Sequence, residues 1–165
     1  MRQSLSETAS IRRPAGPTPG SSRGATGAVV SAIALTVVLL GAAIIDHAGA
    51  RSLLDHAAAA YASYGTSPDP ALLYGIVYTV SVVGLLLWLP VLRAARRGRR
   101  WAPIAAGTAT VVTGMLALTL LFITEYGAPI FPPLWGALAL LPALAGAVAV
   151  VLLVRRPARR GARGG

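Results

Sequence analysis

The sequence predicts an all-α membrane protein, a bundle of four transmembrane helices with a short extracytoplasmic amphipathic helix between spans one and two. Hydrophobic residues make up 55% of the 165-residue chain, and its mean hydropathy is +0.67. Charged residues make up only 12%, about half the ~25% that is usual in a soluble domain. A soluble fold of this size would expose large apolar patches, whereas a bilayer accommodates them. The composition therefore indicates a membrane protein.

Four apolar runs without a charged side chain supply the spans, at residues 27–45, 71–92, 102–124 and 133–154. Each is close to the ~20 residues that an α-helix needs to cross the hydrocarbon core. These runs must be helical, because in lipid every backbone N–H and C=O has to be bonded within the segment. The first run exceeds the ~7–15 apolar residues of a cleavable signal peptide. We therefore expect it to be retained, although the small residues at 48–50 resemble a cleavage site.

Two tails are expected to flank a transmembrane domain that covers residues 27–154. Residues 1–26 are rich in Ser, Pro, Gly, Thr and Arg and show no hydrophobic periodicity, which is typical of a disordered segment. Residues 155–165 are short and basic, and we expect them to be disordered as well.

The connection between spans one and two predicts the amphipathic helix, over residues 53–64. Its apolar side chains recur at i, i+3 and i+4, the spacing of one helical face. Ser52 and Asp55 resemble a capping box at its start, and Gly65 suits the left-handed residue that follows a helix. Asp69 is expected to cap span two. The short helix would lie across the outer ends of the bundle or pack inward against it.

The arginines predict the orientation. Fourteen of the fifteen lie in the two tails and in the connection between spans two and three, and the positive-inside rule places such segments in the cytoplasm. Trp88, Trp101 and Trp135 lie towards the ends of spans, where aromatic rings favour the headgroup layer. We therefore expect a multi-pass protein of the cell (plasma) membrane with both termini in the cytoplasm.

The net charge of +10 does not indicate a nucleic-acid-binding protein. All the basic residues are arginines grouped at the ends of apolar runs, whereas a nucleic-acid footprint is a basic patch or stripe on a folded face. The same arginines would attract anionic lipid headgroups, at about 1 kcal/mol per basic residue. The residues expected to make this contact are Arg93, Arg96, Arg97, Arg99 and Arg100.

Small residues predict the tightest helix–helix contact, because helices in lipid associate through close packing. Two lines at a spacing of four residues would bring spans three and four together. They consist of Ala106, Thr110 and Gly114 in span three and Ala139, Ala143 and Ala147 in span four. The alternative is that Ala and Gly are simply abundant in this chain. Pro142 lies in the middle of span four and predicts a kink, because it cannot donate to the carbonyl of Leu138.

The outer connection holds the candidate residues for chemistry. Asp46, His47, Asp55 and His56 form two Asp-His pairs, and carboxylates and imidazoles are plausible ligands for zinc or another divalent ion. Their spacing matches no established metal motif, so the alternative is that they are solvated groups bordering the short helix. The spans carry no ionisable side chain, which disfavours an ion-coupled transporter. We expect no cofactor.

Three segments resemble small four-helix membrane proteins common in high-GC actinobacteria. They are the Tyr-Ala-Ser-Tyr sequence at 61–64, the arginine-rich run at 96–102 and the Leu-Leu-Pro turn at 140–142. The resemblance covers roughly residues 27–156. It implies a four-helix membrane fold and carries no catalytic residue to this chain.

The sequence favours a structural or accessory subunit that acts through helix–helix contacts. Its expected partners are the bilayer with its anionic headgroups, a second copy of the chain or another membrane protein, and no nucleic acid. Two alternatives stay open. One is a membrane enzyme or metal-binding protein that uses the outer Asp and His residues, and the other is a passive channel for a small solute.

Overall fold

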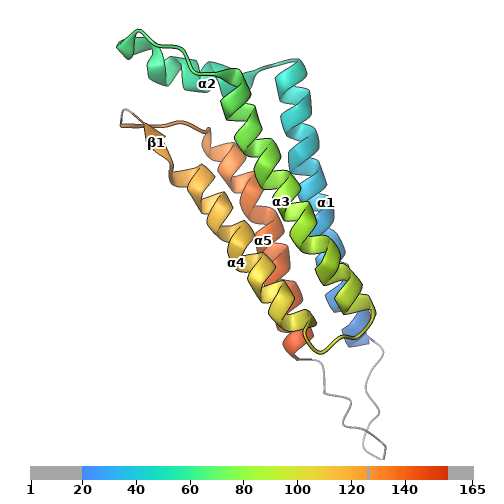
Figure 1. Cartoon of the computed structure of the whole chain (residues 1–165). Helices are drawn as coiled ribbons and strands as arrows, with labels where there is room; N and C mark the ends of the chain where they lie inside the picture. The colour runs from blue at the N-terminus through green and yellow to red at the C-terminus, as the bar shows by residue number, and fades with distance from the viewer. Residues whose placement is uncertain (1–19, 126, 156–165) are drawn as a thin grey trace, which may run out of the picture.

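The computed structural model describes residues 20–125 and 127–155. Five α-helices, a 3₁₀ helix and a two-stranded hairpin make up this part of the chain (Figure 1). In chain order they are α1 (Gly20–Ala48), α2 (Ser52–Tyr61), η1 (Ala62–Tyr64), α3 (Pro70–Arg96), α4 (Ala102–Phe122), β1 (Thr124–Glu125), β2 (Ala128–Pro129) and α5 (Pro133–Val154). Of the expected tails, residues 1–19 and 156–165 lie outside the described residues.

The all-α fold with four span-length helices is confirmed. The four helices are long and apolar enough to cross a membrane, and large apolar side chains such as Ile104 and Phe122 point outward, 74% and 70% exposed. The first helix, α1, extends into the expected tail. It begins at Gly20 rather than at residue 27, and Ala25 is fully buried. The chain thus has the architecture of a multi-pass membrane protein.

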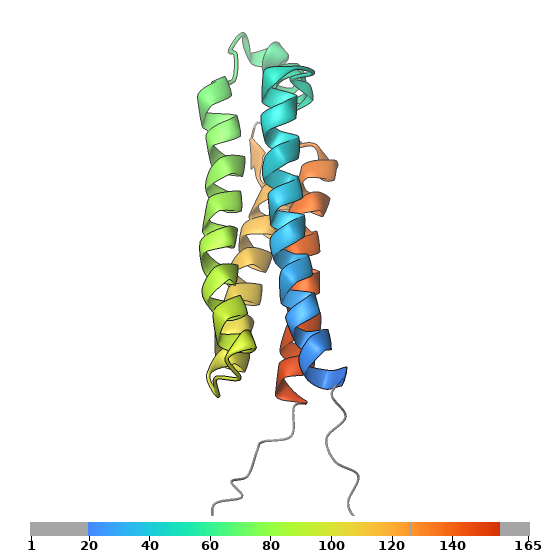
Figure 2. The ribbon, with the colours of Figure 1, turned by 90° about the vertical axis from the view of Figure 1, so that its right-hand side faces the viewer.

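The four long helices alternate in direction around a ring (Figures 1 and 2). α1 packs against α3 and α5, and α4 packs against the same two helices, with the α4–α5 contact the most extensive. The start of α1, the α3–α4 turn and the end of α5 therefore lie together. We call this the arginine end, defined by Arg23, residues 93–100 and Arg155. The opposite end, which carries α2 and the hairpin, is called the cap end.

Two clusters of buried side chains fill the bundle, one towards each end. The cluster at the cap end includes Tyr74, Phe131 and Trp135, and the cluster at the arginine end includes Trp88. Trp88 is fully buried and Trp135 is 5% exposed, so both rings face other helices rather than the outside of the bundle, and their expected level in the headgroup layer stays a prediction. Their rings fill space between helices whose contact faces are rich in alanine and glycine.

The predicted small-residue lines lie on α4 and α5, with most of their members directed into the bundle. Ala106, Ala139 and Ala143 are buried, and Thr110 is half-buried. A Cβ atom placed on Gly114 would lie 3.8 Å from the Cβ atom of Ala143. This is ordinary van der Waals contact, so the two helices approach closely at this level.

Ala147 departs from its predicted position, because it is exposed. A line of every fourth residue rotates by about 40° per step around a helix of 3.6 residues per turn, and by Ala147 it has left the contact face. The face continues instead at Gly146, three residues after Ala143. A Cβ atom on Gly146 would lie 2.2 Å from Cη2 of Trp88 and 2.6 Å from Oγ1 of Thr110. The glycine therefore makes room for the buried indole.

Pro142 does not end α5, which is continuous from Pro133 to Val154. Its side chain is buried, so the position that lacks an N–H donor faces the other helices. The kink that the sequence predicts here stays a prediction.

The connection between α4 and α5 is a short antiparallel hairpin. Thr124 pairs with Pro129 and Glu125 pairs with Ala128, while α4 ends at Phe122, two residues before the expected end of span three. Gly127 lies between the strands with a φ of 79°, a conformation that glycine adopts without steric cost. The hairpin places its backbone beneath α2 at the cap end (Figure 1).

Candidate functional site

Asp46 is the centre of the polar structure at the cap end. Its side chain is 8% exposed, and both carboxylate oxygens accept hydrogen bonds. The backbone N–H and the hydroxyl of Ser52 donate to Oδ1 at 2.9 and 2.6 Å, and the N–H of Leu53 and the hydroxyl of Tyr74 donate to Oδ2 at 3.1 and 2.8 Å. The four donors come from α2 and α3, so this carboxylate joins the end of α1 to both.

A tight turn brings Asp46 to the start of α2. The N–H of Gly49 donates to the carbonyl of Ile45, and the N–H of Arg51 donates to the carbonyl of Asp46. Arg51 has a φ of 52° and is the N-cap residue of α2, without a side-chain cap of its own. Asp46 supplies the missing acceptor instead, satisfying amides that a helix start leaves unpaired.

The capping box expected from Ser52 and Asp55 is therefore wrong. Ser52 is the first residue of α2 rather than its N-cap, and its hydroxyl donates to Asp46. Asp55 is exposed on the outer surface of the helix. A carboxylate six residues before the helix takes the capping role because the α1–α2 turn folds it back onto the helix start.

His47 contacts two tyrosines of α3. Its ring stacks on Tyr74 with 4.1 Å between the ring centroids and 6° between the planes. Its Nδ1 lies 2.9 Å from the hydroxyl of Tyr78. His47 and Tyr78 border a shallow hollow of about 280 Å³, which Ile44 and Ala48 also line. The contacts of His47 with Tyr74 and Tyr78 therefore join the end of α1 to α3 at the cap end.

Two further contacts fasten α2 to the hairpin. Nε2 of His56 lies 3.2 Å from the carbonyl oxygen of Pro129, and because a carbonyl only accepts, this nitrogen carries the proton. The hydroxyl of Tyr61 donates to the carboxylate of Glu125. Leu53 and Ala57 form the buried face of α2. The helix is thus held at its start by Asp46 and along its length by β1 and β2.

The four candidate residues from the sequence do not converge on one point. Asp46 and His47 end α1 and turn to α3, whereas His56 turns to β2 and Asp55 is exposed. In residues 20–125 and 127–155, no group of three or more His, Cys, Asp or Glu side chains is placed to hold a metal ion. What the structure brings together is one carboxylate, one imidazole and the hydroxyls of Ser52, Tyr74 and Tyr78.

Six hydroxyl groups inside the spans bond to their own helices, an arrangement that Ser and Thr side chains commonly adopt there. Each donates to the carbonyl four residues earlier, at 2.7 to 2.9 Å. The residues concerned are Thr36, Thr79, Ser81, Thr110, Thr113 and Thr119. The buried indole Nε1 of Trp88 differs, since it has no hydrogen-bond partner in the described part of the chain.

The fold and its polar cap define a four-span membrane protein with an added helix across one end. Comparison with protein families, with curated proteins and with solved structures finds no match to this chain. The evidence for its role is therefore the distribution of side chains over its own surface and at its cap.

Proposed function

We propose that this chain is a structural or accessory subunit of the cell membrane that acts through helix–helix contacts with a membrane partner. The observation that carries the proposal is the outward face of α1 in the half of the helix next to the arginine end. Gly27, Ser31 and Ala34 are exposed there, and a Cβ atom on Gly27 would meet nothing within 4 Å. Small residues are typical of contact faces between helices in lipid.

Bulkier side chains dominate most of the remaining outer surface, including Val37 and Val38 further along α1. Leu86 on α3, Met115 on α4 and Leu144 on α5 are each more than 60% exposed, as suits surfaces covered by acyl chains. A small-residue face lets a second backbone approach closely, so van der Waals contact replaces a lipid chain there. The partner is a second copy of the chain or another membrane protein.

A non-catalytic role also fits the use of the polar groups at the cap end. The carboxylate of Asp46 accepts four hydrogen bonds, about the number of lone-pair sites that it has. His56 and Tyr61 fasten α2 to the hairpin. These groups support a fixed platform over the bundle, formed by α2, η1 and the hairpin, which the partner would contact outside the hydrocarbon core.

A photoreactive benzophenone amino acid at position 31 tests the contact. In native membranes, irradiation is expected to yield a protein adduct of defined mass, because Ser31 would lie against the partner helix. Mass spectrometry of the adduct identifies the partner, and a product of twice the chain mass indicates a second copy.

The matched control carries the same group at position 108. Thr108 is exposed on α4, and this helix also starts at the arginine end. We expect this variant to give lipid adducts with little protein adduct. Equal protein adducts at both positions, or lipid adducts alone at both, would contradict the proposed contact face.

We further propose that the arginine end faces the cytoplasm and the cap end the exterior. Supporting this, the arginines of the described residues other than Arg51 lie at one end of the bundle, as the positive-inside rule requires of a cytoplasmic face. The chain has no Cys, so single cysteines report topology cleanly. A membrane-impermeant maleimide should label Ser63→Cys in intact cells and Arg97→Cys only after permeabilisation. The reverse pattern would overturn the orientation.

A further inference from the structure

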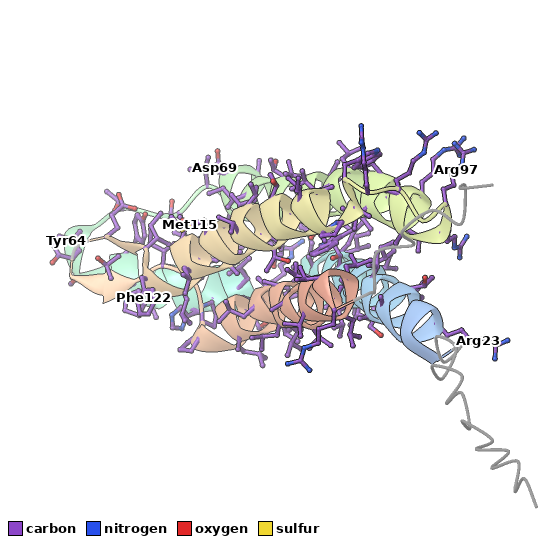
Figure 3. All side chains as sticks on the ribbon, turned by 90° about the horizontal axis from the view of Figure 1, so that it is seen from below. Arg23, Tyr64, Asp69, Arg97, Met115 and Phe122 are labelled. Carbon is purple, nitrogen blue, oxygen red and sulfur yellow. The ribbon has the colours of Figure 1, made fainter. Side chains whose placement is uncertain are left out.

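The arginine end carries a strong positive charge that no described acidic residue balances. Its described basic residues are Arg23, Arg93, Arg96, Arg97, Arg99, Arg100 and Arg155. The acidic residues of the described ranges lie at or beside the cap end, and these are Asp46, Asp55, Asp69 and Glu125. Figure 3 shows this separation, with Arg23 and Arg97 at one end of the bundle and Asp69 towards the opposite end, which carries Tyr64.

Two of these arginines border a common hollow, which is shallow and largely open to the outside. It has a volume of about 350 Å³ and is lined by Arg23 and Thr26 of α1 and by Ala95 and Arg96 of α3. Ala95 is 4% exposed and Thr26 is half-buried, whereas both arginines are exposed. The hollow thus combines small or partly buried residues with two guanidinium groups from different helices.

The position of the hollow along the bundle matches the headgroup layer. The uncharged apolar run of α1 begins at Gly27, and that of α3 ends at Leu92. Arg23 and Arg96 each lie four residues outside these runs, which is about one helical turn. A group bound between these residues would therefore lie where both helices leave the hydrocarbon core. The α1–α3 seam continues from there into the bilayer, where apolar side chains can lie beside an acyl chain.

We propose that Arg23, Thr26, Ala95 and Arg96 form a binding site for the phosphate headgroup of an anionic membrane lipid. A guanidinium presents a planar fork of N–H donors that matches phosphate oxygens, and the hydroxyl of Thr26 supplies a further donor. Neither arginine has a carboxylate partner within the described ranges, so a bound phosphate would provide the missing counter-charge. This site is independent of the protein partner proposed above, because it needs only the bilayer.

The site differs from general attraction to an anionic surface in its dependence on two particular arginines. Arg99 and Arg100 lie at the same end and carry the same charge, but they do not line the hollow. A diffuse attraction would weaken equally when either pair is neutralised. A defined site would weaken mainly when Arg23 and Arg96 are changed.

The test uses the full chain in nanodiscs of phosphatidylcholine with a minor fraction of phosphatidylglycerol, followed by native mass spectrometry. The wild-type chain is expected to retain a phosphatidylglycerol molecule in preference to phosphatidylcholine. The double variant Arg23→Gln/Arg96→Gln should lower the retained fraction on the order of tenfold, whereas Arg99→Gln/Arg100→Gln should retain most of it. Arg23→Lys/Arg96→Lys keeps the charge without the planar fork and should give an intermediate value.

Two further measurements make the outcome decisive. Thermal unfolding is used to check that both glutamine variants are folded. We expect them to be, because all four arginines are exposed. Inorganic phosphate is added as a competitor, and a lipid site should keep its phosphatidylglycerol at millimolar phosphate. Equal loss in the two double variants, or no loss in the Arg23/Arg96 variant, would overturn the proposal. Binding of inorganic phosphate with the same arginine dependence, but without lipid retention, would overturn the lipid as the ligand.

Discussion

Replacing Gly146 with alanine is expected to destabilise the bundle strongly, although it adds only one methyl group. The new Cβ atom would lie 2.2 Å from Cη2 and 2.7 Å from Cζ2 of Trp88, and 2.6 Å from Oγ1 of Thr110. The indole is fully buried, so it cannot swing away without moving α3. Overpacking of this kind costs typically ~1–3 kcal/mol and sometimes more. Thermal unfolding of the purified chain in detergent measures the loss as a lower midpoint.

Gly107→Ala is the matched control, since a Cβ atom there would meet nothing within 4 Å. Alanine is a better helix former than glycine by up to ~1 kcal/mol, so this variant should be as stable as the wild type or slightly more. Trp88→Leu in the Gly146→Ala background should recover part of the lost stability, because it removes the ring that the methyl group meets. If Gly146→Ala unfolded at the same temperature as Gly107→Ala, the close approach of the Trp88 indole to Gly146 would be wrong.

The spans could be predicted from the sequence because their signals are local. An uncharged apolar run of span length indicates a transmembrane helix by itself, and Asp69 before Pro70 marks the start of α3. The structure bears this out, as the side chain of Asp69 accepts a hydrogen bond from the N–H of Ala71 at 2.9 Å. Local signals missed the beginning of α1. Residues 20–26 look like a tail in composition, yet they are helical.

The candidate site could be predicted only in part. The carboxylate of Asp46 and the imidazoles of His47 and His56 identified these residues as candidates, but their partners lie far away in the sequence. Tyr74 is 28 residues from Asp46, and Pro129 is 73 residues from His56. No motif spacing encodes such pairs. The spacing of four residues between Tyr74 and Tyr78 puts them on one helical face, and this signal could have identified them as a unit.

Positive and negative side chains of the described residues lie at opposite ends of the molecule, apart from Arg51. The described carboxylates lie at or beside the cap end, where Asp46 caps α2, Asp69 caps α3 and Glu125 accepts from Tyr61. The arginines at the other end have no such partners among the described residues. Polar groups at the cap end therefore hold the helices in place, whereas the proposed lipid site would use two of the arginines at the other end.

Replacing Asp46 with asparagine is expected to release the start of α2 while the four-helix bundle stays folded. The carboxylate accepts from four donors with two oxygens, whereas a carboxamide has one accepting oxygen and an NH₂ group that donates. Two of the four donors would then face the NH₂ group of asparagine, which cannot accept a hydrogen bond from them. An unsatisfied buried group costs about 1–3 kcal/mol, which is large for a helix of ten residues. Amide hydrogen exchange over residues 52–61 should accelerate.

Asp55→Asn provides the matched control, because Asp55 lies on the same helix and is exposed. The same chemical change there should leave exchange in α2 unchanged. Tyr74→Phe removes one of the four donors and should give an acceleration smaller than that of Asp46→Asn. This order follows from counting donors at one carboxylate, so it discriminates between a structural cap and a solvated aspartate. Equal exchange in the Asp46 and Asp55 variants would show that α2 is held in place without the carboxylate. The platform would then depend on the contacts of His56 and Tyr61 with the hairpin.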